Sequence, residues 1–188
     1  LITRTLGISQ NNFNYLLKKK INIKTKSWII NKIKIFNEIE KNKEILNFGN
    51  KMDKIFYIIK YTDLINLLYK SIKKNKYIKK YKIKNSSFFN SILKEKDNYD
   101  LIINLNEKNI LSQKLFFKRI EKDYNSSAYT SLISHEACDN NIAYQIFTKL
   151  GPLAFLPNSN KKTSVVFSVL NKSNNIPENI IKDLILNY

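Results

Sequence analysis

The sequence predicts an α+β fold with a mostly antiparallel β-sheet. Four short segments rich in β-branched and aromatic residues, with turn-forming clusters between them, fill the C-terminal third of the chain: residues 124–134, 142–148, 153–157 and 164–170. Nearer the N-terminus, Phe13, Leu16 and Leu17 recur at the spacing of one helical face. With 188 residues the chain is long enough to bury a core of its own.

The remaining elements follow from local patterns. Ser9 is a suitable N-cap for the first helix, and Pro177 suits the first turn of the last one, because its missing N–H would have no partner there. Helices are predicted at residues 10–20, 62–74, 86–96, 109–118 and 177–186. Strands are predicted, in addition to the four above, at residues 28–38, 44–48, 55–60, 78–83 and 101–104.

A series of motifs follows the C-terminal strands from Ser126 onward. They are His135-Glu136, Ala143-Tyr144, Phe147, Gly151-Pro152-Leu153-Ala154, Leu156-Pro157, and the stretch from Ser164 to Ser168. In this order the motifs resemble the substrate-binding sheet of the FAD-dependent aromatic monooxygenases, in the branch of the ubiquinone-biosynthesis hydroxylases. The GPLAFLP stretch, at its distance from the His-Glu pair, is a specific match.

The resemblance covers nearly the whole chain. Arg4 opens a segment similar to the family's R-(T/A)-x-A-L-S sequence, and residues 55–64 lie where the family has GY.(V/I)ENR.L. Residues 100–103 match the strand that precedes the family's GADG motif. At these positions the resemblance implies that Arg4, Tyr61 and Thr62 bind the FAD cofactor.

The chain departs from the family at its nucleotide-binding motifs. Residues 60–62 (Lys-Tyr-Thr) replace Glu-Asn-Arg, and residues 104–107 (Asn-Leu-Asn-Glu) replace GADG. Three isolated glycines, Gly7, Gly49 and Gly151, cannot form a G-x-G-x-x-G dinucleotide loop or a P-loop, since both need clustered glycines. Because the family's glycine fingerprint lies upstream of its first matching segment, we expect an internal fragment of a longer enzyme.

The resemblance implies an interleaved piece of a flavin-hydroxylase fold. Residues 1–26 and 61–115 would belong to the flavin-domain side, and residues 27–60 and 116–188 would build the substrate-binding sheet domain. The parent enzyme would use FAD, NAD(P)H and O2 to hydroxylate the aromatic ring of a polyprenylated quinone precursor in ubiquinone biosynthesis. The fragment alone would bind no flavin and oxidise no NAD(P)H.

A lipid-tailed aromatic substrate needs a pocket with apolar walls and few polar anchors. Alternation along a strand places Leu153, Phe155 and Pro157 on one face, with Phe167 opposite on the next strand. These four residues are the predicted substrate-binding residues. Packing in the core of the sheet is the open alternative for each of them. The sequence identifies no catalytic residue.

The formal net charge of +18 leaves two other functions open. The lysines are spread over several predicted elements, so we interpret them as solvated faces and predict no specific nucleic-acid partner. A basic RNA-binding or ribosomal-type protein of an AT-rich genome, with eleven tyrosines to stack on bases, is the alternative from another class. A degenerate, non-catalytic flavin-hydroxylase homologue is a third interpretation, motivated by the altered residues 104–107.

Cysteine and histidine each occur once, as Cys138 and His135. They allow no intramolecular disulfide and no thiolate metal cluster, so no metal site is predicted. No apolar run approaches the roughly 20 residues that span a bilayer, and no signal peptide is recognised. We therefore expect a cytoplasmic protein, with peripheral contact to the inner face of the membrane and to a quinone-biosynthesis complex as further expectations.

Overall fold

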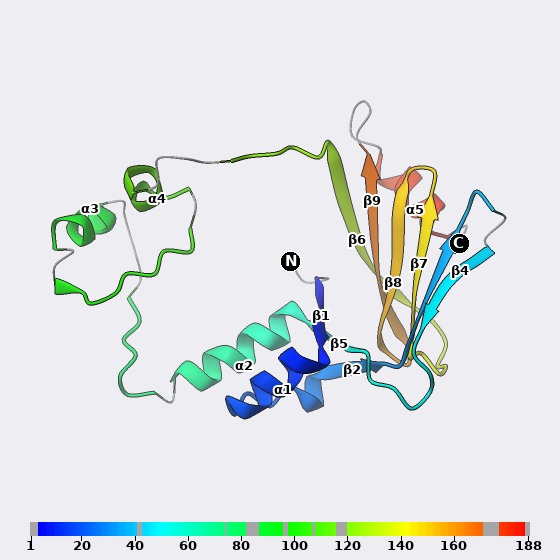
Figure 1. Ribbon diagram of the computed structural model, residues 1–188, viewed down its shortest axis with the longest axis horizontal. Coiled ribbons are helices and arrows are strands. Elements are labelled where there is room, and N and C mark those ends of the chain that lie inside the picture. Colours follow the sequence, from blue (N-terminus) through cyan, green and yellow to red (C-terminus); the bar gives the residue numbers. More distant parts are fainter. Residues whose placement is uncertain are drawn as a thin grey trace. The chain divides into compact units, whose positions relative to one another are not determined.

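The computed structural model describes residues 4–40, 43–73, 75–81, 87–95, 98–106, 108–115, 120–170 and 177–186. The chain forms two compact units (Figure 1): Leu1–Asn75 together with Tyr124–Tyr188, and Lys76–Asp123. Within the described ranges, the second unit holds two short helices, α3 (Ser87–Lys94) and α4 (Ile110–Leu115).

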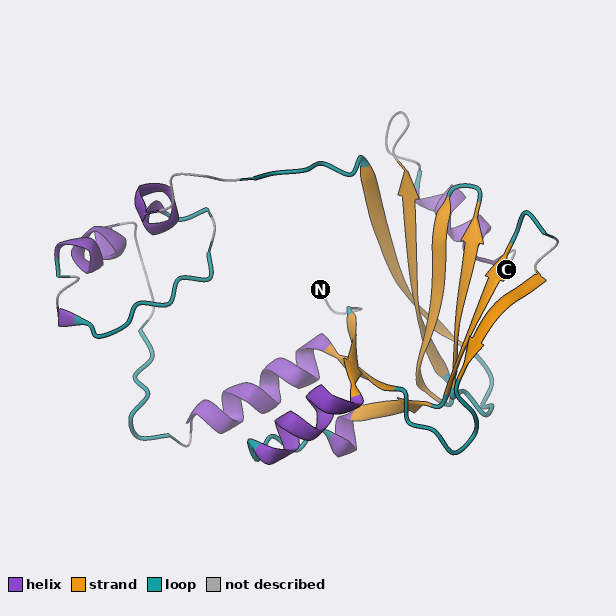
Figure 2. Ribbon diagram, viewed as in Figure 1, coloured by secondary structure: helices purple, strands orange, loops and turns teal. Residues whose placement is uncertain are grey.

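The first unit holds two β-sheets and the helices that cover them (Figure 2). Its elements are β1 (Thr5–Ser9), α1 (Gln10–Lys18), η1 (Lys24–Lys26), β2 (Ser27–Ile30), β3 (Lys32–Asn37), β4 (Lys43–Phe48), β5 (Phe56–Lys60), α2 (Tyr61–Lys73), β6 (Ser126–Ser134), β7 (Ile142–Thr148), β8 (Gly151–Ser159), β9 (Lys162–Leu170) and α5 (Glu178–Leu186).

The smaller sheet has the strand order β1-β5-β2, and both of its pairings are antiparallel. As predicted, Ser9 caps α1: its hydroxyl accepts a hydrogen bond from the backbone N–H of Asn12 over 3.3 Å. Helix α1 buries Phe13, whose ring stacks on Tyr57 of β5 with 3.7 Å between the ring centroids. The apolar face of α1 thus forms one core with the small sheet.

The larger sheet has the order β4-β3-β7-β8-β9-β6. Every neighbouring pair is antiparallel except β3 and β7, which run parallel. This arrangement confirms the predicted α+β class with a mostly antiparallel sheet. The four predicted C-terminal strands are all present, as β6 to β9, because each is a continuous β-favouring run bounded by turns.

The two faces of the larger sheet have different partners. On one face, here called the α5 face, Leu153 and Phe167 form a cross-strand pair and pack against Ile181 and Ile185 of α5. On the opposite face, here called the Ser164 face, residues Ala154, Leu156, Ser164 and Val166 alternate with them along β8 and β9.

The Ser164 face packs on the smaller sheet. Leu156 and the buried Ala143 contact Ile30, Ile58 and the partly buried Trp28 of β2 and β5. The indole N–H of Trp28 also donates a hydrogen bond, over 2.6 Å, to the carbonyl oxygen of residue 140 in the loop before β7. The apolar layer between the sheets therefore fixes which face of the larger sheet is turned toward the N-terminal elements.

The predicted strand at residues 28–38 is wrong as a single element. It is two strands, β2 and β3, which belong to different sheets and are separated at Asn31. At this break the backbone N–H of Asn31 donates to the carbonyl oxygen of Asn141, and the Asn141 side chain donates to the carbonyl oxygen of Ile29. Apolar alternation continues across the break, which is why the sequence reads as one strand.

Two further predicted strands are not strands in the structure. Residues 78–81 and 101–104 have no regular structure, while residues 82 and 83 lie outside the described residues. Their composition favours strands, but a strand needs a neighbour, and no described strand pairs with either segment. Conversely, the structure contains a strand, β1, that the sequence pattern does not predict, because Gly7 interrupts its apolar pattern.

The predicted helices are present as α1 to α5. Residues 74, 86, 96 and 116–118, at the predicted helix ends, lie outside the described residues. The predicted division into two functional parts stays a prediction. Its parts are a flavin-domain side, residues 1–26 and 61–115, and a substrate-binding sheet domain, residues 27–60 and 116–188.

Candidate functional site

Two of the three predicted cofactor residues lie together. Antiparallel pairing of Thr5 with Lys60 brings the start of β1 next to the start of α2. The backbone N–H of Tyr61 donates to the carbonyl oxygen of Arg4 over 3.0 Å, and the Arg4 guanidinium carbon lies 5.4 Å from the centre of the Tyr61 ring. This cation–π contact leaves the in-plane N–H donors of the exposed guanidinium free to meet an anion. Thr62, next in α2, is exposed.

The same end of β1 touches the larger sheet. The hydroxyl of Thr5 donates a hydrogen bond over 3.0 Å to the hydroxyl of Ser164, whose side chain is buried with 1% exposed. Arg4 therefore precedes a residue that is fixed to the Ser164 face.

The predicted substrate-binding residues divide into two pairs. Leu153 and Phe167 are fully buried, with 0% and 1% exposed, in the core beneath α5. The half-buried Phe155 and the fully buried Pro157 contribute to the wall of a cavity of about 440 Å3 at the other end of the α5 face. Its remaining walls are Ile133, His135, Cys138, Asn140, Ile142, Tyr144, Ile146 and Thr163.

At one end of this cavity, polar side chains form a network of contacts with one another. The Asn140 side-chain amide donates to the Thr163 hydroxyl over 3.0 Å and lies 3.2 Å from His135 Nε2. His135 Nδ1 lies 2.8 Å from the carbonyl oxygen of Glu136, and the Cys138 sulfur is 3.8 Å from the same nitrogen. These atoms satisfy one another, so the network fastens the loop after β6. Among the described residues no cluster of three metal-ligating side chains occurs.

Arg4 and the Phe155 cavity belong to opposite sides of the larger sheet. Phe155 pairs with Val165 and Pro157 pairs with Thr163, and Ser164 between these partners points the other way. Thr5 contacts Ser164, so the start of β1 lies on the Ser164 face. The roles of all seven predicted residues stay predictions, but the structure does not bring the two sets together.

The glycines test how much of an FAD site the chain contains. At Gly49 (φ +82°) a Cβ atom would collide with the carbonyl oxygen of Asn31, and at Gly151 (φ +139°) with that of Ser168. At Gly7 a Cβ atom would make an ordinary contact with Phe56 at 3.5 Å. The space beside each glycine is filled by the chain itself, so none of the three cradles a pyrophosphate. The residues present thus fit one part of FAD, at Arg4 and Tyr61, and not its dinucleotide cradle.

Comparisons with known proteins place the fold. No protein-family model and no curated protein matches the chain. The solved structure of FqzB matches with a TM-score of 0.60 and 12% sequence identity, over 93% of this chain and 46% of its own. PqsL, a probable FAD-dependent monooxygenase from Pseudomonas aeruginosa, matches with a TM-score of 0.54 and 10% identity, over 86% of this chain and 46% of its own.

These likenesses show that the chain has part of the fold found in a probable FAD-dependent monooxygenase, and that it spans about half the length of the solved structures it matches. Among the described helices, none has the length and apolar character needed to cross a membrane.

Sequence reasoning missed the contact between Thr5 and Ser164. The one local sign of it is the position of Ser164 within a β-favouring run, directly before Val165 and Val166, since a buried hydroxyl requires a hydrogen-bond partner. Nothing in the sequence around Thr5 indicates that it is that partner.

Proposed function

We propose that the chain is part of an FAD-dependent monooxygenase that hydroxylates an aromatic ring. The observation that carries the proposal is the fold shared with PqsL over 86% of the chain. The order of family-like motifs from Arg4 to Ser168 supports it independently. We further propose a polyprenylated quinone precursor as substrate and NAD(P)H as reductant, on the basis of the ubiquinone-branch motifs.

In this proposal Arg4, Tyr61 and Thr62 hold one part of FAD. The Arg4 guanidinium offers paired N–H donors to phosphate or ribose oxygens, and the Tyr61 ring fixes its direction. Bound FAD, once reduced, supplies the oxygen-transfer chemistry. The contribution of this chain is to orient the ring and to exclude water from it.

The reacting ring has to lie on the side of the sheet that carries FAD. The contact of Thr5 with Ser164 supports the Ser164 face as that side, and the half-buried residues Ala154 and Val166 on it have small side chains. Phe155 and Pro157 lie on the other face, so their proposed substrate contacts are independent of the ring position and need their own test. Both proposals hold together when the substrate's ring lies on the Ser164 face and its apolar tail passes to the α5 face, where it contacts Phe155 and Pro157.

The lipid tail suggests where such an enzyme works. A polyprenylated precursor resides in a membrane, and lysines attract anionic headgroups by about 1 kcal/mol each near the surface. We therefore propose peripheral contact with the inner face of a membrane, and with other enzymes of quinone biosynthesis.

A second candidate function is that of a non-catalytic homologue. Residues 104–107 replace the family's GADG motif, and the described part of this stretch serves helix α4. The side-chain amide of Asn104 donates to the Ser112 hydroxyl over 2.7 Å, and its oxygen accepts from the Asn109 side chain over 2.8 Å. Glu107 lies outside the described residues. A stretch engaged in this way favours a protein that has given up nucleotide handling.

The experiment that tests the proposal uses the longest protein that the gene encodes. It should purify yellow and oxidise NAD(P)H in the presence of a prenylated phenol, and with 18O2 it should incorporate one labelled oxygen into the ring. Residues 1–188 alone should purify colourless. NAD(P)H-dependent flavin reduction at a normal rate would rule out the non-catalytic homologue. A colourless longer protein would refute the monooxygenase and favour the non-catalytic homologue.

A further inference from the structure

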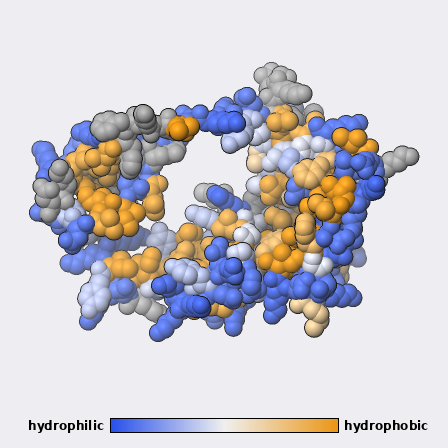
Figure 3. All heavy atoms as spheres, viewed as in Figure 1, coloured by the Kyte–Doolittle hydropathy of each residue, from blue (hydrophilic) through white to orange (hydrophobic). Residues whose placement is uncertain are grey.

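The turn that follows helix α1, residues 18–26 and here called the basic turn, carries five lysines within nine residues. All five are exposed: Lys18, Lys19, Lys20, Lys24 and Lys26. From Leu1 to Asn37 the sequence has eight basic residues and neither aspartate nor glutamate. Within the described part of the chain, none of the five lysines forms an ion pair. Figure 3 shows hydrophilic side chains, in blue, over α1 on the face in view. The basic turn is therefore a surface of uncompensated positive charge.

The core of the small sheet holds the backbone of the basic turn in place. Ile23, between the lysines, is fully buried with 0% exposed, and the half-buried Ile21 packs against the same core. The backbone N–H of Ile21 donates to the carbonyl oxygen of Leu16 over 2.9 Å. That of Lys20 donates to the carbonyl oxygen of Leu17 over 2.9 Å, and the two bonds together close the end of α1. The lysines thus project from a backbone of defined shape.

Lys20 has a backbone conformation that favours glycine. Its φ is +60°, and it follows the C-cap residue Lys19, at the position where helices most often carry glycine. A residue with a Cβ atom is less stable in this left-handed conformation than glycine is. The charge of Lys20 therefore stands at a position where the fold alone favours glycine. A substitution there can remove the charge without removing a contact that the fold needs.

The side chains around the lysines suit a lipid–water interface better than a nucleic acid. Tyr15 is 58% exposed, and the centre of its ring lies 5.7 Å from the ammonium nitrogen of Lys19. Tyrosine and lysine both place an apolar part and a polar end at such an interface. Single-stranded nucleic acids need several exposed rings on which bases stack. Between Gln10 and Ser27 the structure offers them only Tyr15, since Phe13 is buried.

We propose that the basic turn is the surface with which the protein binds an anionic membrane, with Tyr15 at the level of the lipid headgroups. The negative charge of phospholipid headgroups attracts clustered lysines within a Debye length of the bilayer. Five exposed lysines, in a stretch of 37 residues without an acidic side chain, are complementary to that charge. The inference rests on the proposed function in so far as that function places the substrate in a membrane.

The test measures how the longest protein that the gene encodes binds to lipid vesicles, by cosedimentation. Vesicles of phosphatidylcholine with about 30% phosphatidylserine should bind it, and vesicles of phosphatidylcholine alone should not. Lys20→Gln together with Lys24→Gln should weaken the binding by at least about fivefold. A rise in salt from about 0.1 M to about 0.5 M should release the wild type, because the attraction is screened. Lys20→Gly should weaken the binding by about threefold without lowering the melting temperature.

The matched control removes the same charge from a region of mixed sign. Lys161 and Lys162 are exposed. The backbone N–H of His135 donates to the carbonyl oxygen of Lys161 over 3.0 Å, and the loop after His135 contains the acidic residues Glu136 and Asp139. Lys161→Gln together with Lys162→Gln should therefore weaken vesicle binding by less than about twofold.

Each outcome of the test decides one question. Wild-type vesicle binding by the variant with both Lys20→Gln and Lys24→Gln, or an equal loss in the control, would overturn the basic turn as the membrane-binding surface. Binding to structured RNA that is stronger than binding to vesicles, and that the same variant loses, would replace the membrane by a nucleic acid. Vesicle binding through the basic turn by a protein without FAD would support the surface and refute the proposed function. Hydroxylation by a protein that leaves anionic vesicles unbound would overturn the surface and leave the proposed function intact.

Discussion

The hydroxyl of Thr5 donates a hydrogen bond to the hydroxyl of Ser164 over 3.0 Å, although 159 positions separate the two residues. Thr5 is the first residue of the small sheet, and Ser164 lies in the fourth C-terminal strand with 1% of its surface exposed. The bond joins the two sheets next to Arg4. It therefore shows that the candidate cofactor residues lie near the Ser164 face of the larger sheet, the face that the apolar layer turns toward the N-terminal elements.

Removal of one hydroxyl of this pair should destabilise the chain. Thr5→Val keeps the shape of the side chain but leaves the buried Ser164 hydroxyl without its partner, at an expected cost of about 1–3 kcal/mol in the free energy of unfolding. Urea unfolding of residues 1–188 measures it. Thr130→Val, on the same face but exposed, should change stability by less than about 0.5 kcal/mol. The double change Thr5→Val with Ser164→Ala should cost less than the sum of the single changes, and additivity would contradict a direct bond.

Gly151 should be required for the entry into β8. Its φ of +139° disfavours any side chain, and a Cβ atom would collide with the carbonyl oxygen of Ser168 in β9. We expect Gly151→Ala to reduce the free energy of unfolding by about 1–3 kcal/mol. Gly7→Ala, which makes only an ordinary contact with Phe56, should cost less than about 1 kcal/mol. Equal melting temperatures for the two variants would show that the backbone at Gly151 is not constrained.

Phe155 and Phe167 should differ although both were predicted to bind substrate. Phe167 is buried in the core, so Phe167→Ala should cost about 3–5 kcal/mol of stability. Phe155 is half-buried in a cavity wall, and Phe155→Ala should cost clearly less. If Phe155 also contacts substrate, the longer enzyme carrying Phe155→Ala should show a raised KM for the prenylated phenol, or NAD(P)H oxidation uncoupled from hydroxylation. Unchanged KM and coupling would remove it from the substrate site.

Local sequence patterns predict most of the helices and strands, but they do not predict which sheet each strand joins. The C-terminal strands could be predicted because each is a β-favouring run between turns. The change of sheet at Asn31 could not, since apolar residues alternate through it and only the pairing partners of β2 and β3 differ. The segment at residues 101–104 has strand composition but, among the described residues, no strand to pair with.

The candidate site also combines contacts between adjacent strands with contacts that depend on how the two sheets pack. The contact between Arg4 and Tyr61 follows from the pairing of two adjacent strands, whereas the family resemblance assigned both residues to FAD without relating them to each other. The position of Phe155 relative to Arg4 depends instead on how two sheets pack, through Thr5 and Ser164. A contact between residues so far apart in sequence leaves no periodic signal. Alternation along β8 correctly grouped Leu153, Phe155 and Pro157 on one face, but it could not say which face lies near Arg4.

Arg4 should affect cofactor affinity without affecting the fold. Its side chain is exposed, so Arg4→Ala should change the stability of residues 1–188 by less than about 0.5 kcal/mol. In the longer protein the same change should weaken FAD binding by about tenfold or more, measured by quenching of flavin fluorescence. Arg4→Lys keeps the charge but not the planar pair of donors, and its affinity should lie between the two. Wild-type FAD affinity in the Arg4→Ala protein would refute the predicted contact.

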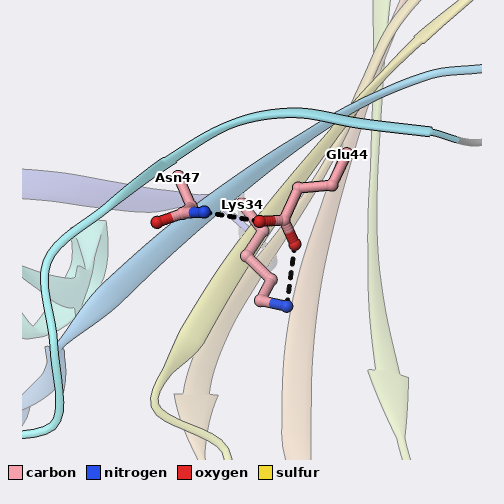
Figure 4. A network of polar contacts seen from close by, with 3 residues as sticks. All are labelled: Lys34, Glu44 and Asn47. Carbon is pink, nitrogen blue, oxygen red and sulfur yellow. Dashed lines mark hydrogen bonds and ion pairs between the residues drawn. The ribbon is translucent and has the colours of Figure 1, made fainter.

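An ion pair between β3 and β4 should make stability depend on pH. Lys34 Nζ lies 2.9 Å from one carboxylate oxygen of Glu44, and the Asn47 side chain donates to the other over 2.5 Å (Figure 4). The hydrogen bond from Lys34, followed by that from Asn47, lowers the pKa of Glu44 below its ordinary value of 4.5. The hydrogen bond to Glu44 and its negative charge raise the pKa of Lys34 above 10.5.

The signs of these shifts define the pH range in which the pair contributes. Because the folded-state pKa of Glu44 is lowered, its contribution is complete above pH 4.5 and is lost as the pH falls through the lowered pKa. The contribution of Lys34 is complete below pH 10.5 and is lost as the pH rises through its raised pKa.

Glu44→Gln should therefore reduce the loss of melting temperature between about pH 6 and about pH 3. Glu40→Gln, which removes a more exposed carboxylate 3.6 Å from Lys43, should keep the wild-type slope. Both partners of the pair are open to solvent, so added salt should shrink the difference between the two variants. Identical acid slopes for the two at low salt would show that the Lys34–Glu44 pair contributes nothing to stability in solution.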